Sequence, residues 1–140
     1  MPAPVPDEIK KEFEEAEICA SVEAWRAASA MLRSVLEKTL KANGYDDKRS
    51  NLQQRIDQAV ADGVITEARS RRAHANIRVL GNDILHEPWR EVKPDEYDDA
   101  HLYAQRVLED FYDDRSTVEG ILIAKNRLHP PPSPPPSTPP

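Results

Sequence analysis

The sequence predicts an all-α fold, an antiparallel bundle of about five helices with a disordered proline-rich C-terminal tail. Apolar residues recur every three or four positions through most of the chain, which is the spacing of one buried helix face. Only 4 of the 140 residues are glycine, and most of the 13 prolines lie near the two ends, so long helices are permitted between them. We therefore place one helical domain at residues 7–128 and the tail at residues 129–140.

The first two helices are expected over residues 7–18 and about 22–43. The carboxylates of Asp7 and Glu8 suit the positive end of a helix dipole. The second helix has the clearest apolar spacing in the chain, and Gly44 supplies a left-handed residue to end it. Its expected buried face consists of Val22, Trp25, Ala28, Ser29, Leu32, Val35, Leu36 and Leu40.

The next two helices are bounded by capping and breaking residues. Ser50 and Gln53 predict a capping box at the start of a third helix, which Gly63 ends. Its buried side should contain Leu52, Ile56 and Val60. Thr66 can cap a fourth helix that continues to about Leu85, since Pro88 prevents further extension.

The C-terminal part of the domain is less regular in pattern. Pro94 and Asp95 should start a fifth helix. Its inward residues are expected to be Ala100, Tyr103, Ala104, Val107, Leu108 and Phe111. Residues 116–128 are either a last short helix or a strand, because apolar spacing over so short a segment fits both.

The tail from residue 130 is Pro-Pro-Pro-Ser-Pro-Pro-Pro-Ser-Thr-Pro-Pro. Such a segment favours an extended polyproline II conformation without a core. It is interpreted as a spacer or a processing remnant. The alternative is a ligand for a proline-binding groove, although the tail has no flanking Arg or Lys.

The amino-acid composition limits the classes of protein to which this chain is expected to belong. The net charge of −6 argues against a general nucleic-acid coat protein, but it leaves room for a local basic patch. Cys19 is the only cysteine, so neither an intrachain disulfide nor a cysteine-based zinc site is expected. The N-terminal residues do not resemble a signal peptide, and the apolar run at 121–124 is too short for a membrane span. We expect a cytoplasmic protein with no membrane association.

Metal and cofactor sites are not predicted either. The glycines are isolated, so no phosphate-binding loop is present. His86-Glu87 is followed by Pro88, and position 90 is Arg instead of the second His of a zinc-protease helix. Asp98 and His101 lie one turn apart without a third ligand nearby, which favours a solvated acidic face.

The fourth predicted helix carries the most information about function. It concentrates four arginines, at 69, 71, 72 and 78, within an acidic protein. Projected at about 100° per residue, the segment separates into two faces. The expected core face consists of Ala73, Ile77, Leu80 and Ile84. Arg78, Asn82 and His86 follow each other at steps of four residues and lie roughly on the opposite face. These three residues are here named the polar ridge.

Several neighbours of the polar ridge bear on its interpretation. Arg71 and Ala75 belong to the same side, and Val79 and Leu85 flank it. Gly81 lies beside it in mid-helix, where glycine costs about 1 kcal/mol relative to alanine and usually permits a close approach. These small or apolar residues favour pairing of this face across a two-fold axis.

Two interpretations of the polar ridge remain open. Either it forms a functional site, or its residues satisfy buried partners such as Glu37 on the second helix. Arg33 and Glu37 are one turn apart, so part of the set could form a structural ion-pair network.

A family resemblance rests on two segments, Arg33-Ser-Val-Leu-Glu37 and Ile77-Arg78-Val-Leu-Gly81-Asn82-Asp-Ile-Leu-His86. Together they resemble a bacterial family of domains of unknown function among the HEPN-like helical proteins, over most of residues 7–115. The resemblance implies an antiparallel bundle, usually dimeric, common in toxin–antitoxin and phage-defence systems. Active members of the wider superfamily are metal-independent endoribonucleases. They use an Arg and a His four to six residues later, often with Asn after the Arg.

Carried over to this sequence, the resemblance assigns His86 as the acid/base for the RNA 2′-hydroxyl and Asn82 as the polar position. Gly81 occupies the usual Arg slot, and Arg78, one turn earlier, would hold the phosphate. This departure fits weak or lost ribonuclease activity. RNA would be bound by Arg71, Arg72 and Arg78, and no cofactor or metal is implied.

The expected partners are a second copy of the chain, RNA, and a partner protein of the antitoxin or restriction type. The rival hypothesis is a non-catalytic interaction or regulatory domain in which the same residues are structural.

Overall fold

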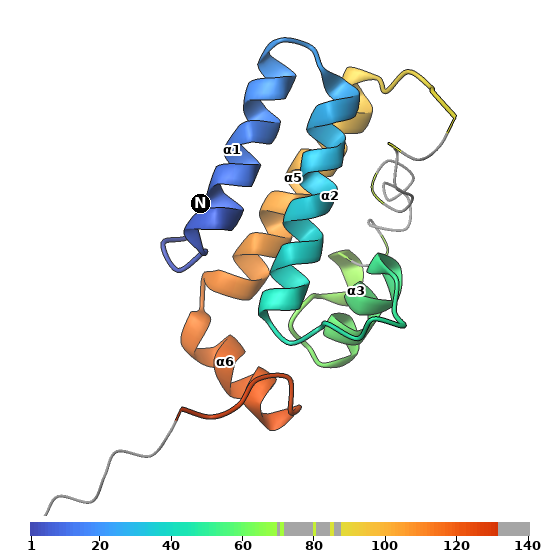
Figure 1. Ribbon diagram of the computed structural model, residues 1–140. Helices are drawn as coiled ribbons and strands as arrows, with labels where there is room; N and C mark the ends of the chain where they lie inside the picture. Colours follow the sequence, from blue (N-terminus) through green and yellow to red (C-terminus); the bar gives the residue numbers. More distant parts are fainter. Residues whose placement is uncertain (70, 72–79, 81–84, 86–87, 132–140) are drawn as a thin grey trace, which may run out of the picture.

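The computed structural model describes residues 1–69, 71, 80, 85 and 88–131 (Figure 1). Within these residues the regular structure is helical and no strand is present. The helices are α1 (Asp7–Ser21), α2 (Trp25–Ala42), α3 (Leu52–Ala61), α5 (Pro94–Tyr112) and α6 (Arg115–Ala124). Residues 67–69 are also helical. The predicted all-α fold is confirmed for the described part of the chain.

The three long helices α1, α2 and α5 lie side by side, with α2 in contact with both of the others (Figure 1). A short turn joins α1 to α2, so the two run antiparallel. At the end of the bundle where α2 finishes, α3 packs on α2 and α6 follows α5 (Figure 1). α2 is thus the element against which most of the fold is assembled.

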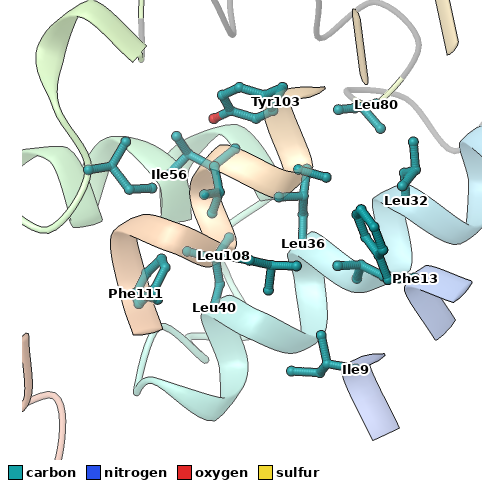
Figure 2. Close-up of a cluster of buried hydrophobic side chains, with 14 of the residues drawn as sticks. Ile9, Phe13, Leu32, Leu36, Leu40, Ile56, Leu80, Tyr103, Leu108 and Phe111 are labelled. Carbon is teal, nitrogen blue, oxygen red and sulfur yellow. The ribbon is translucent and has the colours of Figure 1, made fainter. Parts of the chain in front are cut away.

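The core is one cluster of apolar side chains to which all five helices contribute (Figure 2). All six inward residues predicted for α5 are buried, which confirms its face. Six residues of the face predicted for α2 are buried as well, namely Ala28, Ser29, Leu32, Val35, Leu36 and Leu40. Burial of these apolar groups is the main source of stability in a domain of this size.

The prediction for the start of the second helix is wrong by three residues. α2 begins at Trp25, and Val22 lies in the preceding turn with 73% of its surface exposed. The cause is local: Glu23 adopts a left-handed φ of 61°, and the Ala24 N–H donates to the carbonyl of Cys19 at 2.9 Å. Trp25 is half-buried and packs against the core and the ring of Tyr97.

The capping box of α3 is shifted by one residue from its predicted place. Asn51 Oδ1 accepts a hydrogen bond from the Gln54 N–H at 2.9 Å, and Gln54 Oε1 accepts one from the Asn51 N–H at 2.9 Å. Ser50 and Asn51 are both good capping residues, and this register buries Leu52 and Ile56. Val60 is only half-buried, whereas Ala59 is fully buried.

Residues 115–124 settle the alternative left open by the sequence, because they form the helix α6. Asp114 Oδ1 accepts a hydrogen bond from the Thr117 N–H at 3.4 Å and caps its start. Val118 and Leu122, four residues apart, are its buried side chains. That spacing places both on one helix face toward the core.

After α6 the chain is held against the loop that follows α2. The Arg127 guanidinium lies 4.7 Å from the ring centroid of Tyr45, and its Nε donates to Asp62 Oδ2 at 2.9 Å. Tyr45 also donates its hydroxyl to Asp62, at 2.8 Å. Gly44, with φ of 89°, lies directly under the Arg127 carbonyl, where a Cβ atom would collide with backbone.

Three glycine-to-alanine substitutions test this packing in chemical denaturation. Gly44→Ala should lower the free energy of unfolding by about 2–5 kcal/mol, because left-handed strain adds to a backbone collision. Gly63→Ala, with φ of 87° and open space, should lose only about 1–2 kcal/mol. Gly120→Ala, within α6 and also in open space, should gain about 0.5–1 kcal/mol. Equal effects at Gly44 and Gly63 would contradict the close approach of Arg127.

Candidate functional site

Most of the predicted site lies outside the described residues. This applies to Arg72 and to the polar ridge, Arg78, Asn82 and His86. Arg71 is described and exposed, and Arg33 and Glu37 lie on α2. The site is therefore built from the contacts that fix the segment at its described positions.

The start of the segment is fixed by a cap and an ion pair. Thr66 Oγ1 accepts a hydrogen bond from the Arg69 N–H at 3.3 Å, which confirms Thr66 as the predicted cap. The Arg69 guanidinium lies 2.6 Å from the carboxylate of Asp110 on α5. Both side chains are largely shielded, with 26% and 13% of their surfaces exposed. An ion pair thus connects this first helical turn to α5.

Burial controls the electrostatics of this contact. It raises the pKa of the Asp110 carboxyl above its ordinary value, and Arg69 opposes the shift only in part. Burial, and then the negative charge of Asp110, raise the pKa of the neighbouring Tyr103 hydroxyl. Asp110 therefore depends on Arg69 as the compensating charge.

A second set of contacts, core packing and a hydrogen bond, fixes the segment at Leu80. The Leu80 side chain is fully buried in the core, on the same side of the cluster as Leu32 and Tyr103 (Figure 2). Its carbonyl accepts a hydrogen bond from Arg33 Nη1 at 2.5 Å. Arg33 Nε donates to Glu37 Oε1 at 2.9 Å, so the predicted pairing of these two residues is confirmed.

The link from Arg33 to Leu80 was missed by the sequence analysis. The one-turn spacing of Arg33 and Glu37 indicated an ion pair, but a backbone carbonyl leaves no signal in the sequence. Of the two partners, Arg33 is the more shielded, with 19% of its side chain exposed against 44% for Glu37. A largely buried arginine has to satisfy several donors, and the carbonyl supplies one acceptor.

Three described residues of the segment can be compared with the two predicted faces. Leu80, assigned to the core face, is fully buried. Arg71, assigned to the side of the polar ridge, is exposed, and Leu85, which flanks it, is 56% exposed. Leu80 and Leu85 lie in turns, so the predicted helix is not regular at these two positions. The burial of Leu80 agrees with its place on the predicted core face, and Arg71 and Leu85 are exposed, while the polar ridge itself lies outside the described residues and stays a prediction.

Asp98 and His101 were also considered as metal ligands from the sequence, and in the structure His101 takes part in packing. His101 lies between the rings of Phe13 and Tyr97, and its Nε2 is 3.4 Å from Glu17 Oε2. Across the part of the chain that the structure describes, no three His, Cys, Asp or Glu side chains are grouped to hold a metal ion. Every described helix is too short or too polar to cross a membrane.

The ion pair between Arg69 and Asp110 predicts an asymmetric response to substitution. Arg69→Met should lower the free energy of unfolding by about 1–3 kcal/mol at neutral pH, because it leaves Asp110 shielded and unpaired. Asp110→Asn should cost less, about 1 kcal/mol, because the amide oxygen can still accept a hydrogen bond from Arg69, whose side chain keeps 26% of its surface in water.

The pH dependence of Arg69→Met follows from the raised pKa of Asp110. Removing Arg69 raises that pKa further, and the protonated carboxyl carries no unpaired charge. The loss of stability should therefore shrink as the pH falls through the folded-state pKa, measured by urea denaturation at neutral and acidic pH. A loss that grows toward acidic pH would contradict the assignment.

Comparison with known proteins places this helical chain in a family. Searches of the curated proteins and of the solved structures found no match. A family model described as "Domain of unknown function (DUF4145)" matches residues 14–127, which include α2, α3, α5, α6 and the whole candidate segment. The match covers well over half of the chain. The chain therefore belongs to the DUF4145 family of domains of unknown function.

Proposed function

We propose that this protein is a HEPN-like helical module that contacts RNA with the polar ridge, in a bacterial defence or toxin–antitoxin context. Weak or lost metal-independent ribonuclease activity is part of the proposal. The observation that supports it best is the division of the segment at its three described positions. Leu80 is in the core and Arg71 and Leu85 are exposed, so a ridge on the side of Arg71 would be accessible to a ligand.

Phosphate contacts would supply the affinity. Arg71 is exposed, and Arg72 and Arg78 follow in the same segment. Arg69 is excluded from this role because its charge is engaged by Asp110. A guanidinium binds phosphate through paired hydrogen bonds, and each contact releases counterions. The net charge of −6 restricts such binding to this local patch.

His86 would supply the chemistry if any is retained. An imidazole transfers protons near neutral pH, and Arg78 would stabilise the charge on the phosphate. Because Gly81 occupies the usual Arg position, the positive charge comes from Arg78, about one helical turn earlier. This displacement of the charge is the basis for expecting weak activity.

Pairing of two copies would complete the module. Ala75, Val79, Gly81 and Leu85 are small or apolar residues next to the polar ridge. Leu85 is 56% exposed, and a large apolar side chain left in water favours association. A two-fold contact at this face would bring the two ridges together.

The alternative is a non-catalytic interaction or regulatory domain. The contacts of Arg33 favour it, since this arginine binds Glu37 and the Leu80 carbonyl and is thus structural. In that case the polar ridge would bind a partner protein, or its residues would hold the bundle together.

RNA binding tests the proposal. Single-stranded RNA should bind the protein with a strong dependence on salt, measured by fluorescence anisotropy. Arg78→Ala should weaken binding and reduce the slope of log affinity against log salt by about 1. His86→Ala should spare binding and abolish any cleavage that persists in EDTA. The matched control is Arg106→Ala, because Arg106 is an exposed arginine on α5 that pairs with Glu109.

Folding must be monitored in the same variants by circular dichroism and melting. If Arg78→Ala unfolds the protein and the wild type does not bind RNA even at low salt, the ridge is structural. The interaction-domain alternative would then replace the proposal.

A further inference from the structure

A groove lies at the start of α2, at the opposite end of the bundle from α6 (Figure 1). Residues 89–92 form one wall, and the turn at residues 23–24 with the first turn of α2 forms the other. The volume of the groove is about 420 Å³. Its apolar lining consists of Ala24, Trp25, Ala27, Leu85, Trp89 and Val92.

The two tryptophans dominate this groove. Trp25 is half-buried and packs against the ring of Tyr97, with ring centroids 5.5 Å apart and planes tilted by 42°, while Trp89 has 75% of its surface exposed. A single exposed apolar side chain is ordinary on a protein surface. Here, however, the exposed indole stands at a concave surface with further apolar residues, which is the form of a ligand-binding groove.

The charges of the groove favour an uncharged ligand. Glu23 and Glu91 are offset by Arg26 and Arg90 among its lining residues, so its formal net charge is zero. Arg90 is also paired with Glu96 on α5, at 3.3 Å. A nucleic acid or a strongly charged peptide would therefore gain no net attraction here.

The chain itself contains an uncharged, proline-rich segment that suits such a groove. Residues 130–140 have eight prolines, two serines and one threonine, and no charged side chain. Proline-rich segments in polyproline II form bind aromatic-lined grooves, because their rings pack on indole faces and little entropy is lost on binding.

The geometry of the bundle assigns the groove and the tail to different molecules. The Arg127 carbonyl touches Gly44, just after the end of α2, whereas Trp25 is the first residue of α2. An 18-residue helix spans about 27 Å. In polyproline II form, Pro134 and Pro135 lie no more than about 22 and 25 Å from Arg127, so neither proline triplet can fill the groove of its own molecule, and only the residues from Pro136 onward span the distance.

We propose that the groove formed by Trp25, Trp89 and Val92 binds the proline-rich tail of a second copy of this chain. The contact is made by proline rings against the indoles and does not use the polar ridge. It therefore stands independently of RNA binding, and the tail is an interaction segment instead of a spacer.

The two groove residues Trp25 and Trp89 are the only tryptophans in the chain, so tryptophan emission of the full-length protein reports on this groove alone. A synthetic peptide of residues 129–140 should shift the emission to shorter wavelength in a saturable way. In sedimentation, the full chain should associate as its concentration rises, and excess peptide should reduce that association. Replacing both proline triplets, 130–132 and 134–136, by alanine in the peptide should abolish both effects.

Two variants of the full chain complete the experiment. Trp89→Ala should abolish peptide binding and the part of self-association that the peptide competes with, while leaving the melting temperature near that of the wild type, since Trp89 is exposed. Leu102→Ala, which removes an exposed apolar side chain outside the groove, should change neither. The proposal is overturned if the peptide leaves the emission unchanged at millimolar concentration. It is also overturned if either Trp89→Ala or excess peptide leaves self-association unchanged, which would indicate that all pairing uses another surface, such as the face beside the polar ridge.

Discussion

The hydrogen bond from Arg33 to the carbonyl of Leu80 joins the central helix to the segment that carries the candidate site. Leu80 occupies the core, so it cannot turn outward without removing a large apolar side chain from its packing. Arg69 restrains the start of the same segment through Asp110. The proposed RNA contact depends on the orientation that these contacts impose on the segment at Arg69 and Leu80.

The helical faces of α2 and α5 could be predicted because long helices repeat their apolar pattern over several turns. Val22 was misassigned because its apolar character continues the pattern across a turn that Glu23 makes in a left-handed conformation. The register of α3 could not be chosen from sequence, since Ser50 and Asn51 are both good caps. In the candidate site, Arg33 and Glu37 could be paired from their spacing. The contacts of Arg69 with Asp110 and of Arg33 with Leu80 could not, because they join residues far apart in the chain.

Two surfaces with different chemistry result from this arrangement. The segment after Thr66 places arginines on an acidic protein, where phosphate binding would be local and dependent on salt. The groove at Trp25 and Trp89 has balanced charges and an apolar lining, so it would select by shape and ring packing. The two surfaces use different forces, and they meet at Leu85, which lines the groove and flanks the polar ridge.

Thiol labelling of single-cysteine variants tests the orientation of the segment most directly. In a Cys19→Ser background, Asn82→Cys should react with a maleimide nearly as fast as a cysteine in an unfolded chain. Ile77→Cys, on the predicted core face, should be strongly protected under native conditions and react only after denaturation. Equal rates, or protection of Asn82→Cys with rapid labelling of Ile77→Cys, would contradict an exposed polar ridge.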